Sequence, residues 1–219
     1  MTQLDLSVEF ATNPEPRCAC VLLLDVSGSM SGRPIDALNE GLKAFATDLS
    51  TDSLARQRVE VAIVTFGGDG VTVEQDFVTA SGFEPRRLSA GGGTPMGAAI
   101  EKAIDMVDTR KQAYRENGIV YYRPWVFLLT DGEPTDDWKQ AAARVRTAEE
   151  ANGLAFFAVG VDGANIDVLS KIATRTPLKL DGLKFVELFV WLSRSQRAVS
   201  TSKPGDQTAL PTVDGWAVV

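Results

Sequence analysis

A chain of 219 residues is long enough for one α/β domain and needs no second hydrophobic core. Hydrophobic residues make up 44% and charged residues 23%, as in ordinary globular proteins, and the net charge of −7 argues against a nucleic-acid partner. The sequence holds no histidine and two cysteines, which excludes Ser-His-Asp and Cys-His catalysis and leaves too few ligands for a zinc site.

The N-terminus and the cysteines indicate the compartment. The first ten residues, MTQLDLSVEF, lack the basic and apolar regions of a secretory signal, and no stretch approaches the roughly 20 apolar residues of a membrane span. Cys18 and Cys20 stand two residues apart, which on a strand places both on one face, and reduced core residues are favoured over a disulfide. We therefore expect a cytoplasmic protein without a membrane span.

The first half of the chain predicts a strand, a helix and a hairpin. The apolar run Ala19–Leu24 is typical of a strand buried on both faces of a parallel sheet. A helix starts at Pro34, and its apolar positions are Ile35, Leu38, Leu42, Phe45 and Leu49. A second buried run, Val59–Phe66, is separated from the more polar run Val71–Val78 by the turn Gly67-Gly68-Asp69-Gly70. So short a connection predicts that Val71–Val78 is an antiparallel edge strand.

The second half alternates helices with strands. A helix is expected after Thr94-Pro95, with the Thr94 hydroxyl as its N-cap, and another is expected from Thr135 or Asp136 to about Ala151. The remaining expected elements, in chain order, are the buried strands Trp125–Thr130 and Leu154–Val161, a short helix over Ile166–Ala173, a brief strand near Leu178–Leu180 and a last helix over about Leu183–Val199.

This order of elements predicts an α/β fold with a doubly wound, mostly parallel six-stranded sheet, one antiparallel edge strand and helices on both faces. We expect residues 1–199 to form this domain. Residues 200–219 are rich in Pro, Gly, Ser and Thr but also carry Leu210 and Trp216, so we expect a tail docked on the domain. A disordered tail is the alternative.

Three polar segments follow predicted strands or precede a helix, and together they carry the chemistry. They are Asp25-Val26-Ser27-Gly28-Ser29 after the first strand, Gly91-Gly92-Gly93-Thr94 before a helix, and Leu129-Thr130-Asp131-Gly132 at the end of another buried strand. Loops that leave the carboxyl ends of strands in a doubly wound sheet converge where ligands bind. We therefore expect the side-chain oxygens of these segments to meet in one crevice.

The residue types in this crevice suit a hard divalent cation. Asp25, Ser27 and Ser29 alternate, so an extended loop turns their oxygens to one side, while Thr94 adds a hydroxyl and Asp131 a second carboxylate. Mg²⁺ prefers octahedral oxygen ligands and keeps several waters, so the hydroxyls are expected to coordinate directly and the aspartates through water. Mg²⁺ is the expected ion, with Mn²⁺ and Ca²⁺ as alternatives. A carboxylate from outside would complete the coordination.

Each segment also has an ordinary structural explanation. Asp and Ser form turns and caps, a run of glycines forms a flexible loop, and Thr94 alone is explained as a helix N-cap. The acidic residues Glu133, Asp136 and Asp137 either shape the rim of the crevice or complement the dipole of the helix that they precede. The joint occurrence of all three segments, each beside the appropriate element, favours the metal site.

The triplet DVSGS, GGT and TDG resembles the metal-ion-dependent adhesion site of von Willebrand factor A domains, and the resemblance extends from about Cys18 to Val199. It implies a Rossmann-like fold in which Ser27, Ser29 and Thr94 bind the metal directly and Asp25 and Asp131 bind it through water or conditionally. No residue of the motif departs from the family pattern.

Within that family the chain is most similar to bacterial TerY-type proteins linked with tellurite resistance and chemical stress. The similarity rests on DVSGSMSGRPIDALNEGL, GGGTPMG, LLTDGEPTDDW and the LP…DGW ending. It implies a scaffold that works with a kinase, a phosphatase or other Ter proteins. Some relatives add a zinc-binding tail, for which this chain lacks the Cys and His residues.

These residues are compatible with three functions. The first is a metal-dependent protein-binding module without enzymatic activity, in which a partner supplies an acidic residue to the metal. The second is a Mg²⁺-dependent phosphatase or phosphotransfer enzyme, although the usual second carboxylate two residues after Asp25 is here Ser27. The third is a structural protein whose metal ion only holds the loops together.

Overall fold

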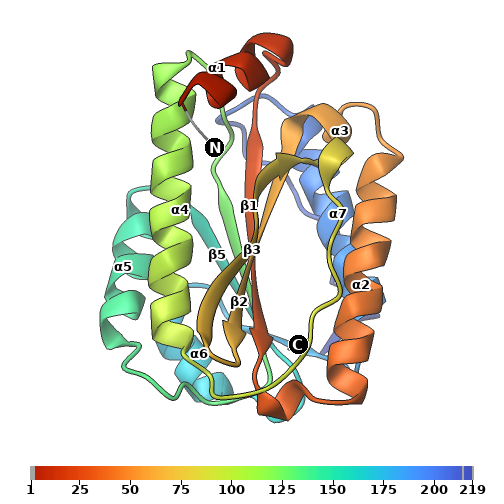
Figure 1. Ribbon diagram of the computed structural model, residues 1–219, viewed down its shortest axis with the longest axis vertical. Helices are drawn as coiled ribbons and strands as arrows, with labels where there is room; N and C mark the ends of the chain where they lie inside the picture. The colour runs from red at the N-terminus through yellow and green to blue at the C-terminus, as the bar shows by residue number, and fades with distance from the viewer. Residues whose placement is uncertain (1–2, 214, 219) are drawn as a thin grey trace.

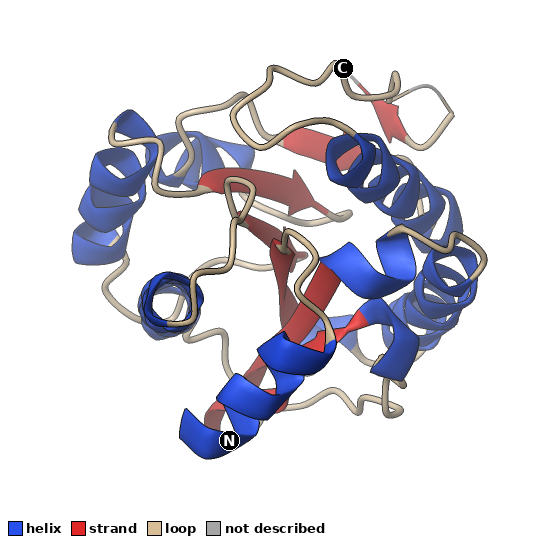
Figure 2. Cartoon of the chain, turned by 90° about the horizontal axis from the view of Figure 1, so that it is seen from above, coloured by secondary structure: helices blue, strands red, loops and turns tan. Residues whose placement is uncertain are grey.

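The computed structural model describes residues 3–213 and 215–218, and they form one seven-stranded sheet between two layers of helices (Figures 1 and 2). The strand order is β3-β2-β1-β4-β5-β6-β7. The strands are β1 (Cys18–Val26), β2 (Val59–Gly67), β3 (Gly70–Thr79), β4 (Trp125–Thr130), β5 (Ala155–Gly160), β6 (Leu178–Leu180) and β7 (Ala217–Val218). The inner strands pair in parallel, and β3 is antiparallel to β2. The predicted fold class, a doubly wound and mostly parallel sheet, is confirmed, but the sheet has seven strands rather than the predicted six because β7 joins it.

The helices divide between the two faces of the sheet. In Figure 1, α4 (Met96–Glu116) and α5 (Lys139–Glu150) lie on one side of the strands, and α2 (Arg33–Ser50) and α7 (Phe185–Thr201) lie on the other. The shorter helices are α1 (Gln3–Thr12), α3 (Ala55–Arg58) and α6 (Ile166–Ile172). Every side chain of β1 and β2 is buried, because both faces of these strands are covered.

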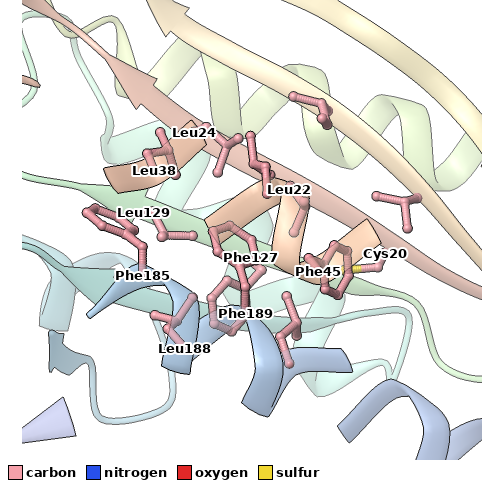
Figure 3. Close-up of a cluster of buried hydrophobic side chains, with 14 of the residues drawn as sticks. Cys20, Leu22, Leu24, Leu38, Phe45, Phe127, Leu129, Phe185, Leu188 and Phe189 are labelled. Carbon is pink, nitrogen blue, oxygen red and sulfur yellow. The ribbon is translucent and has the colours of Figure 1, made fainter. Parts of the chain in front are cut away.

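Two hydrophobic cores fill the spaces between the layers, one on each face of the sheet. On the face of α2 and α7, Figure 3 shows Phe45, Phe185 and Phe189 packed over Leu22 and Phe127 of the sheet. Within this packing, a Cβ added at Gly41 would lie 2.6 Å from the Phe189 ring, so a residue without a side chain lets α2 and α7 approach closely. Alternate residues of β1 face the second core, against α4 and α5.

Several boundaries differ from the sequence-based expectations. Helix α1 was not predicted, α5 begins at Lys139 rather than at Thr135 or Asp136, and α7 is shifted by two residues to Phe185–Thr201. The residue before α4 is Pro95, which makes no side-chain cap, so the prediction that Thr94 is the N-cap was wrong. The strands Leu178–Leu180 and Trp125–Thr130 have the predicted bounds.

The C-terminal segment adds a second antiparallel edge to the sheet. Strand β7 pairs with β6, and the peptide N–H of Asp181 donates to the carbonyl of Trp216 (2.8 Å). Trp216 is buried, and its ring centroid lies 5.2 Å from that of Trp191, whose indole N–H donates to the carbonyl of Pro211 (2.8 Å). These contacts place the described part of the tail against α7 and β6.

The two cysteines are free and buried in the core beside α7. Burial raises the pKa of the Cys20 thiol to about 12, and burial also raises the pKa of Cys18, whose Sγ lies 2.8 Å from Oε1 of Gln196. Both thiols therefore stay protonated near neutral pH.

Among the helices of residues 3–213 and 215–218, none combines the length and apolar content that crossing a membrane requires.

A buried ionic cluster joins α1, β1, β2 and α4 at the amino end of the sheet. Its centre is Glu60 of β2, whose carboxylate accepts hydrogen bonds from Arg17 Nε (2.7 Å), from Arg110 Nε and Nη2 (2.8 Å each) and from the Tyr114 hydroxyl. Glu60 and Arg17 are fully buried, and Arg110 is nearly so. The Arg110 guanidinium also pairs with Glu9 and lies 5.0 Å from the Phe10 ring, which fastens α1 to the domain.

Candidate metal centre

The candidate centre lies at the carboxyl ends of β1 and β4. In the parallel pair β1–β4, Leu24 lies opposite Leu129, so the residues that follow, Asp25 and Thr130, lie side by side near the ends of these strands. The Thr130 hydroxyl donates to Oδ2 of Asp25 (2.5 Å), and the peptide N–H of Ser27 donates to Oδ1 (2.8 Å). Asp25 is fully buried, so both of its oxygens are held in fixed directions.

A chain of hydroxyl and carboxylate groups connects the first and third segments. Ser27 Oγ and Ser29 Oγ lie 2.9 Å apart, and Ser29 Oγ donates to Oδ1 of Asp131 (2.7 Å). Ser27 and Asp131 are buried, whereas Ser29 is exposed on the 3₁₀ helix η1 (Gly28–Met30). One member of the cluster is therefore open to the outside while the others are held inside.

Thr94 joins the same cluster from the glycine loop. A Cβ added at Gly132 would lie 3.4 Å from Thr94 Oγ1, 3.7 Å from Ser29 Oγ and 3.8 Å from Asp25 Oδ2. Oxygens from three separate segments thus surround one small space, which any residue larger than glycine at position 132 would occupy. The structure therefore brings together all five residues that the sequence singled out: Asp25, Ser27, Ser29, Thr94 and Asp131.

The charges of the cluster are uncompensated by protein cations. Burial raises the pKa of Asp25, and the charge of Asp131 adds to this effect, while hydrogen bonds from Ser27 and Thr130 oppose it. Burial likewise raises the pKa of Asp131, and its hydrogen bond from Ser29 opposes the shift. Within residues 3–213 and 215–218, no Lys or Arg forms an ion pair with either carboxylate. Two buried carboxylates surrounded by hydroxyls are a donor set that fits a hard cation.

The glycine loop is held against β1 and the β2–β3 hairpin by backbone contacts. The peptide N–H of Gly91 donates to the carbonyl of Val26 (2.8 Å), and that of Gly28 donates to the carbonyl of Gly92 (3.0 Å). Gly92 has a φ of +69°, and a Cβ there would lie 2.2 Å from the carbonyl oxygen of Gly68. Glycine at position 92 is therefore required both by conformation and by space.

Residues after Asp131 position Thr94, and the sequence analysis missed this role. The Thr135 hydroxyl accepts a hydrogen bond from the Thr94 N–H (3.0 Å), and the Thr135 N–H donates to the Thr94 carbonyl (2.9 Å). The Asp136 carboxylate accepts from the N–H groups of Gly97 (2.9 Å) and Ala98 (2.8 Å). Asp136 therefore caps α4, a different helix from the one that it precedes. The only sequence signal was a Thr-Asp pair shortly after TDG.

Comparisons with known proteins show the family of this chain. A family model described as the von Willebrand factor type A domain matches residues 20–180. Inter-alpha-trypsin inhibitor heavy chain H4 of Homo sapiens is 32% identical over 123 residues, which are 52% of this chain and 12% of that protein, so the chain spans only a small part of that relative.

Solved structures share the fold at low sequence identity. The open conformation of the pilus adhesin SpaC from Lactobacillus rhamnosus GG matches with a TM-score of 0.64 and 16% identity, over 84% of this chain and 30% of that one. The manganese-loaded TRAP protein of Plasmodium vivax matches with a TM-score of 0.55 and 19% identity, over 80% and 73%. The chain belongs to the von Willebrand factor type A domain family.

Proposed function

We propose that this chain is a protein-binding module that captures its partner through one divalent cation held by Asp25, Ser27, Ser29, Thr94 and Asp131. The observation that carries the proposal is the pair of buried carboxylates without a protein cation, beside converging hydroxyls from three segments. A bound divalent cation would offset the negative charge of the two aspartates. The TRAP relative is described as manganese-loaded, which supports a divalent ion in this fold family. We propose Mg²⁺ as the ion in this chain, with Mn²⁺ or Ca²⁺ as substitutes.

The donor set favours recognition of an acidic partner. Three of the five side chains are neutral hydroxyls, so the bound cation would retain enough positive charge to attract a further carboxylate. Ser29 is exposed, so the centre can be reached from outside. The residue two positions after Asp25 is Ser27, whose hydroxyl is bonded to Ser29, rather than the second carboxylate of aspartyl-phosphate enzymes. This favours binding over phosphate transfer.

The cellular setting is proposed from the sequence alone. The motifs DVSGSMSGRPIDALNEGL and LLTDGEPTDDW resemble those of TerY-type proteins, and on this basis we propose a cytoplasmic scaffold in a tellurite-resistance or chemical stress complex. Partners of that complex, such as a kinase, a phosphatase or other Ter proteins, are part of the same proposal.

The proposal is tested by capture of partners from a lysate of the native host, with Mg²⁺ and with EDTA, using the wild-type chain and the Ser27→Ala/Ser29→Ala variant. We expect a partner that is retained only by the wild type with Mg²⁺. Calorimetric titration of both proteins with Mg²⁺ accompanies the capture, because it separates loss of metal binding from loss of the partner surface. Equal capture with Mg²⁺ and EDTA would contradict the proposed role of the cation.

Thr135 is expected to act on the metal through Thr94. In Thr135→Val the side chain keeps its shape but no longer accepts from the Thr94 N–H, so the Thr94 hydroxyl loses its fixed position. Loss of a residue that hydrogen-bonds to a metal ligand typically weakens metal affinity by about 10–100-fold. We expect a Mg²⁺ dissociation constant at least about 10-fold higher by calorimetry. Thr135→Ser, which keeps the hydroxyl, serves as the control, and an equal loss in both variants would refute a role for this hydrogen bond.

A further inference from the structure

An open cavity lies at the end of the sheet opposite the candidate metal centre. Its walls come from the segment that enters β4, the first residue of β5, the carboxyl half of α4 and the tail from Gly205 to Leu210, and its volume is about 1180 Å³. Strand β4 runs from Trp125, at this cavity, to Thr130, beside Asp25, so the two sites are separated by the length of a strand. The family site does not account for this cavity.

The charge of the cavity wall is opposite to that of the chain. Four basic residues line it and Asp206 is the one acidic lining residue among the described residues, whereas the whole chain carries a net charge of −7. The basic residues are Lys111, Arg115, Arg123 and Arg175. Basic side chains concentrated in one hollow of an acidic protein indicate an anionic ligand.

Two of these guanidinium groups share one buried carboxylate. The side chain of Glu149 is 4% exposed; Oε1 of Glu149 pairs with Arg175 Nη1 and lies 3.8 Å from Arg123 Nη2. Burial lowers the pKa of both arginines, and the charge of Arg123 adds to the lowering for Arg175. One carboxylate between two guanidinium groups leaves an excess of positive charge at the wall, which a bound anion would neutralise.

Several hydrogen-bond donors at this wall are unused. Arg123 donates through Nε to the Leu154 carbonyl (2.6 Å) and through Nη2 to the Glu149 carbonyl (3.0 Å). Arg115 donates through Nε to the Tyr121 hydroxyl (3.2 Å). Within residues 3–213 and 215–218, Nη1 of Arg123, both Nη atoms of Arg115, and Nε and Nη2 of Arg175 have no protein partner. Such forked donors match the oxygens of a phosphate group.

Aromatic side chains form another part of the wall. The ring centroids of Trp125 and Phe157 lie 4.7 Å apart, and the Arg175 guanidinium lies 5.1 Å from the Phe157 ring. Tyr121 is half-buried, with its ring 5.3 Å from that of Tyr114. Planar groups beside the basic residues suit a ligand with a ring of its own. The volume of about 1180 Å³ also exceeds what a bare phosphate needs and is somewhat above the usual range of small-molecule sites.

We propose that this cavity binds a small ligand that combines a phosphate group with an aromatic ring, of the nucleoside monophosphate class. The phosphate lies against the four basic residues of the wall, and the ring packs on the side of Tyr121, beside Arg115. The tail from Gly205 to Leu210 forms the outer wall. This site is a binding site for a small molecule and does not require the cation at Asp25.

The test is calorimetric titration with AMP at low salt and in EDTA, which prevents phosphate from binding through a metal ion. We expect saturable binding to the wild type and about 10-fold or greater weakening in Lys111→Gln/Arg115→Gln, because each lost charged hydrogen bond is worth a factor of this order. Arg86→Gln removes the same type of charge from an exposed loop outside the cavity and should leave the affinity unchanged. Adenosine and inorganic phosphate should each bind at least about 10-fold more weakly than AMP.

Folding of each variant is checked by circular dichroism. The Ser27→Ala/Ser29→Ala variant should bind AMP as the wild type does, and this result would show that the cavity binds its ligand independently of the metal centre. The proposal is overturned by absence of AMP binding to the folded wild type, by equal affinity in the double variant, or by phosphate binding as tightly as AMP.

Discussion

Replacing Glu60 by glutamine is expected to lower the free energy of unfolding by about 3–5 kcal/mol, the cost of leaving buried charges without their partner. Glutamine keeps the shape of the side chain but removes the negative charge between Arg17 and Arg110, and it presents an amide N–H to groups that already donate. Burial, together with the charge of Glu60, raises the pKa of Tyr114, so its hydroxyl remains a donor to this position. Among the described residues, the buried Arg17 guanidinium would then have no carboxylate partner, and Arg110 would keep only Glu9.

The measurement is urea unfolding of wild type and variant, monitored by circular dichroism. Glu40→Gln is the matched control, because Glu40 pairs with Lys43 at 2.8 Å while both side chains are 60% exposed, and exposed pairs of this kind contribute little. We expect no measurable change there. A Glu60→Gln variant as stable as Glu40→Gln would show that the buried cluster does not hold α1, β2 and α4 together.

The second large effect is expected for Asp25→Asn, in which Mg²⁺ should raise the free energy of unfolding much less than it does in the wild type. A ligand present at 1,000 times its dissociation constant stabilises a folded protein by about 4 kcal/mol, and a 100-fold weaker ligand at that concentration by about 1.4 kcal/mol. Asp25→Asn keeps the hydrogen bond from the Ser27 N–H but removes one of the two buried charges that would attract the cation. We therefore expect Mg²⁺ to raise the unfolding free energy of the wild type by about 4 kcal/mol and that of Asp25→Asn by about 1.4 kcal/mol or less.

In EDTA the wild type should lose its advantage in stability over Asp25→Asn. Without a cation the wild type holds Asp25 and Asp131 close together in a buried site, whereas the variant holds one carboxylate, so Asp25→Asn should be at least as stable as the wild type. Unfolding with and without Mg²⁺ measures both effects. Asp137→Asn, exposed on the loop before α5, is the control for a nearby charge outside the cluster. Equal Mg²⁺ stabilisation of wild type and Asp25→Asn would rule out Asp25 as part of a metal site.

The sequence predicted the buried strands and the members of the candidate site because both depend on local patterns. Runs such as Trp125–Thr130 are apolar at nearly every position, and the structure buries every residue of that strand. Asp25 and Asp131 each follow such a run, and in a parallel sheet the carboxyl ends of neighbouring strands meet at one edge. Their proximity therefore follows from strand order, which the alternation of strands and helices already indicated.

Helix boundaries were predicted less well where a side chain serves a distant element. Thr135 and Asp136 have the residue types of a helix start, but Thr135 bonds the backbone of Thr94 and Asp136 caps α4, so α5 begins only at Lys139. Helix α1 was missed because its place depends on contacts of Glu9 and Phe10 with Arg110, which is distant in the sequence.

The sequence by itself therefore determined the family, the order of strands β1 to β6 and the oxygen-bearing residues of the candidate centre, because each is encoded by periodicity or by short motifs at strand ends. Only the tertiary structure decided which groups hold those residues in place, how Glu60 is neutralised, where β7 joins the sheet, and that four basic residues gather in one cavity at the far end. These features depend on side chains that are far apart along the chain and meet only when the sheet and its helices pack.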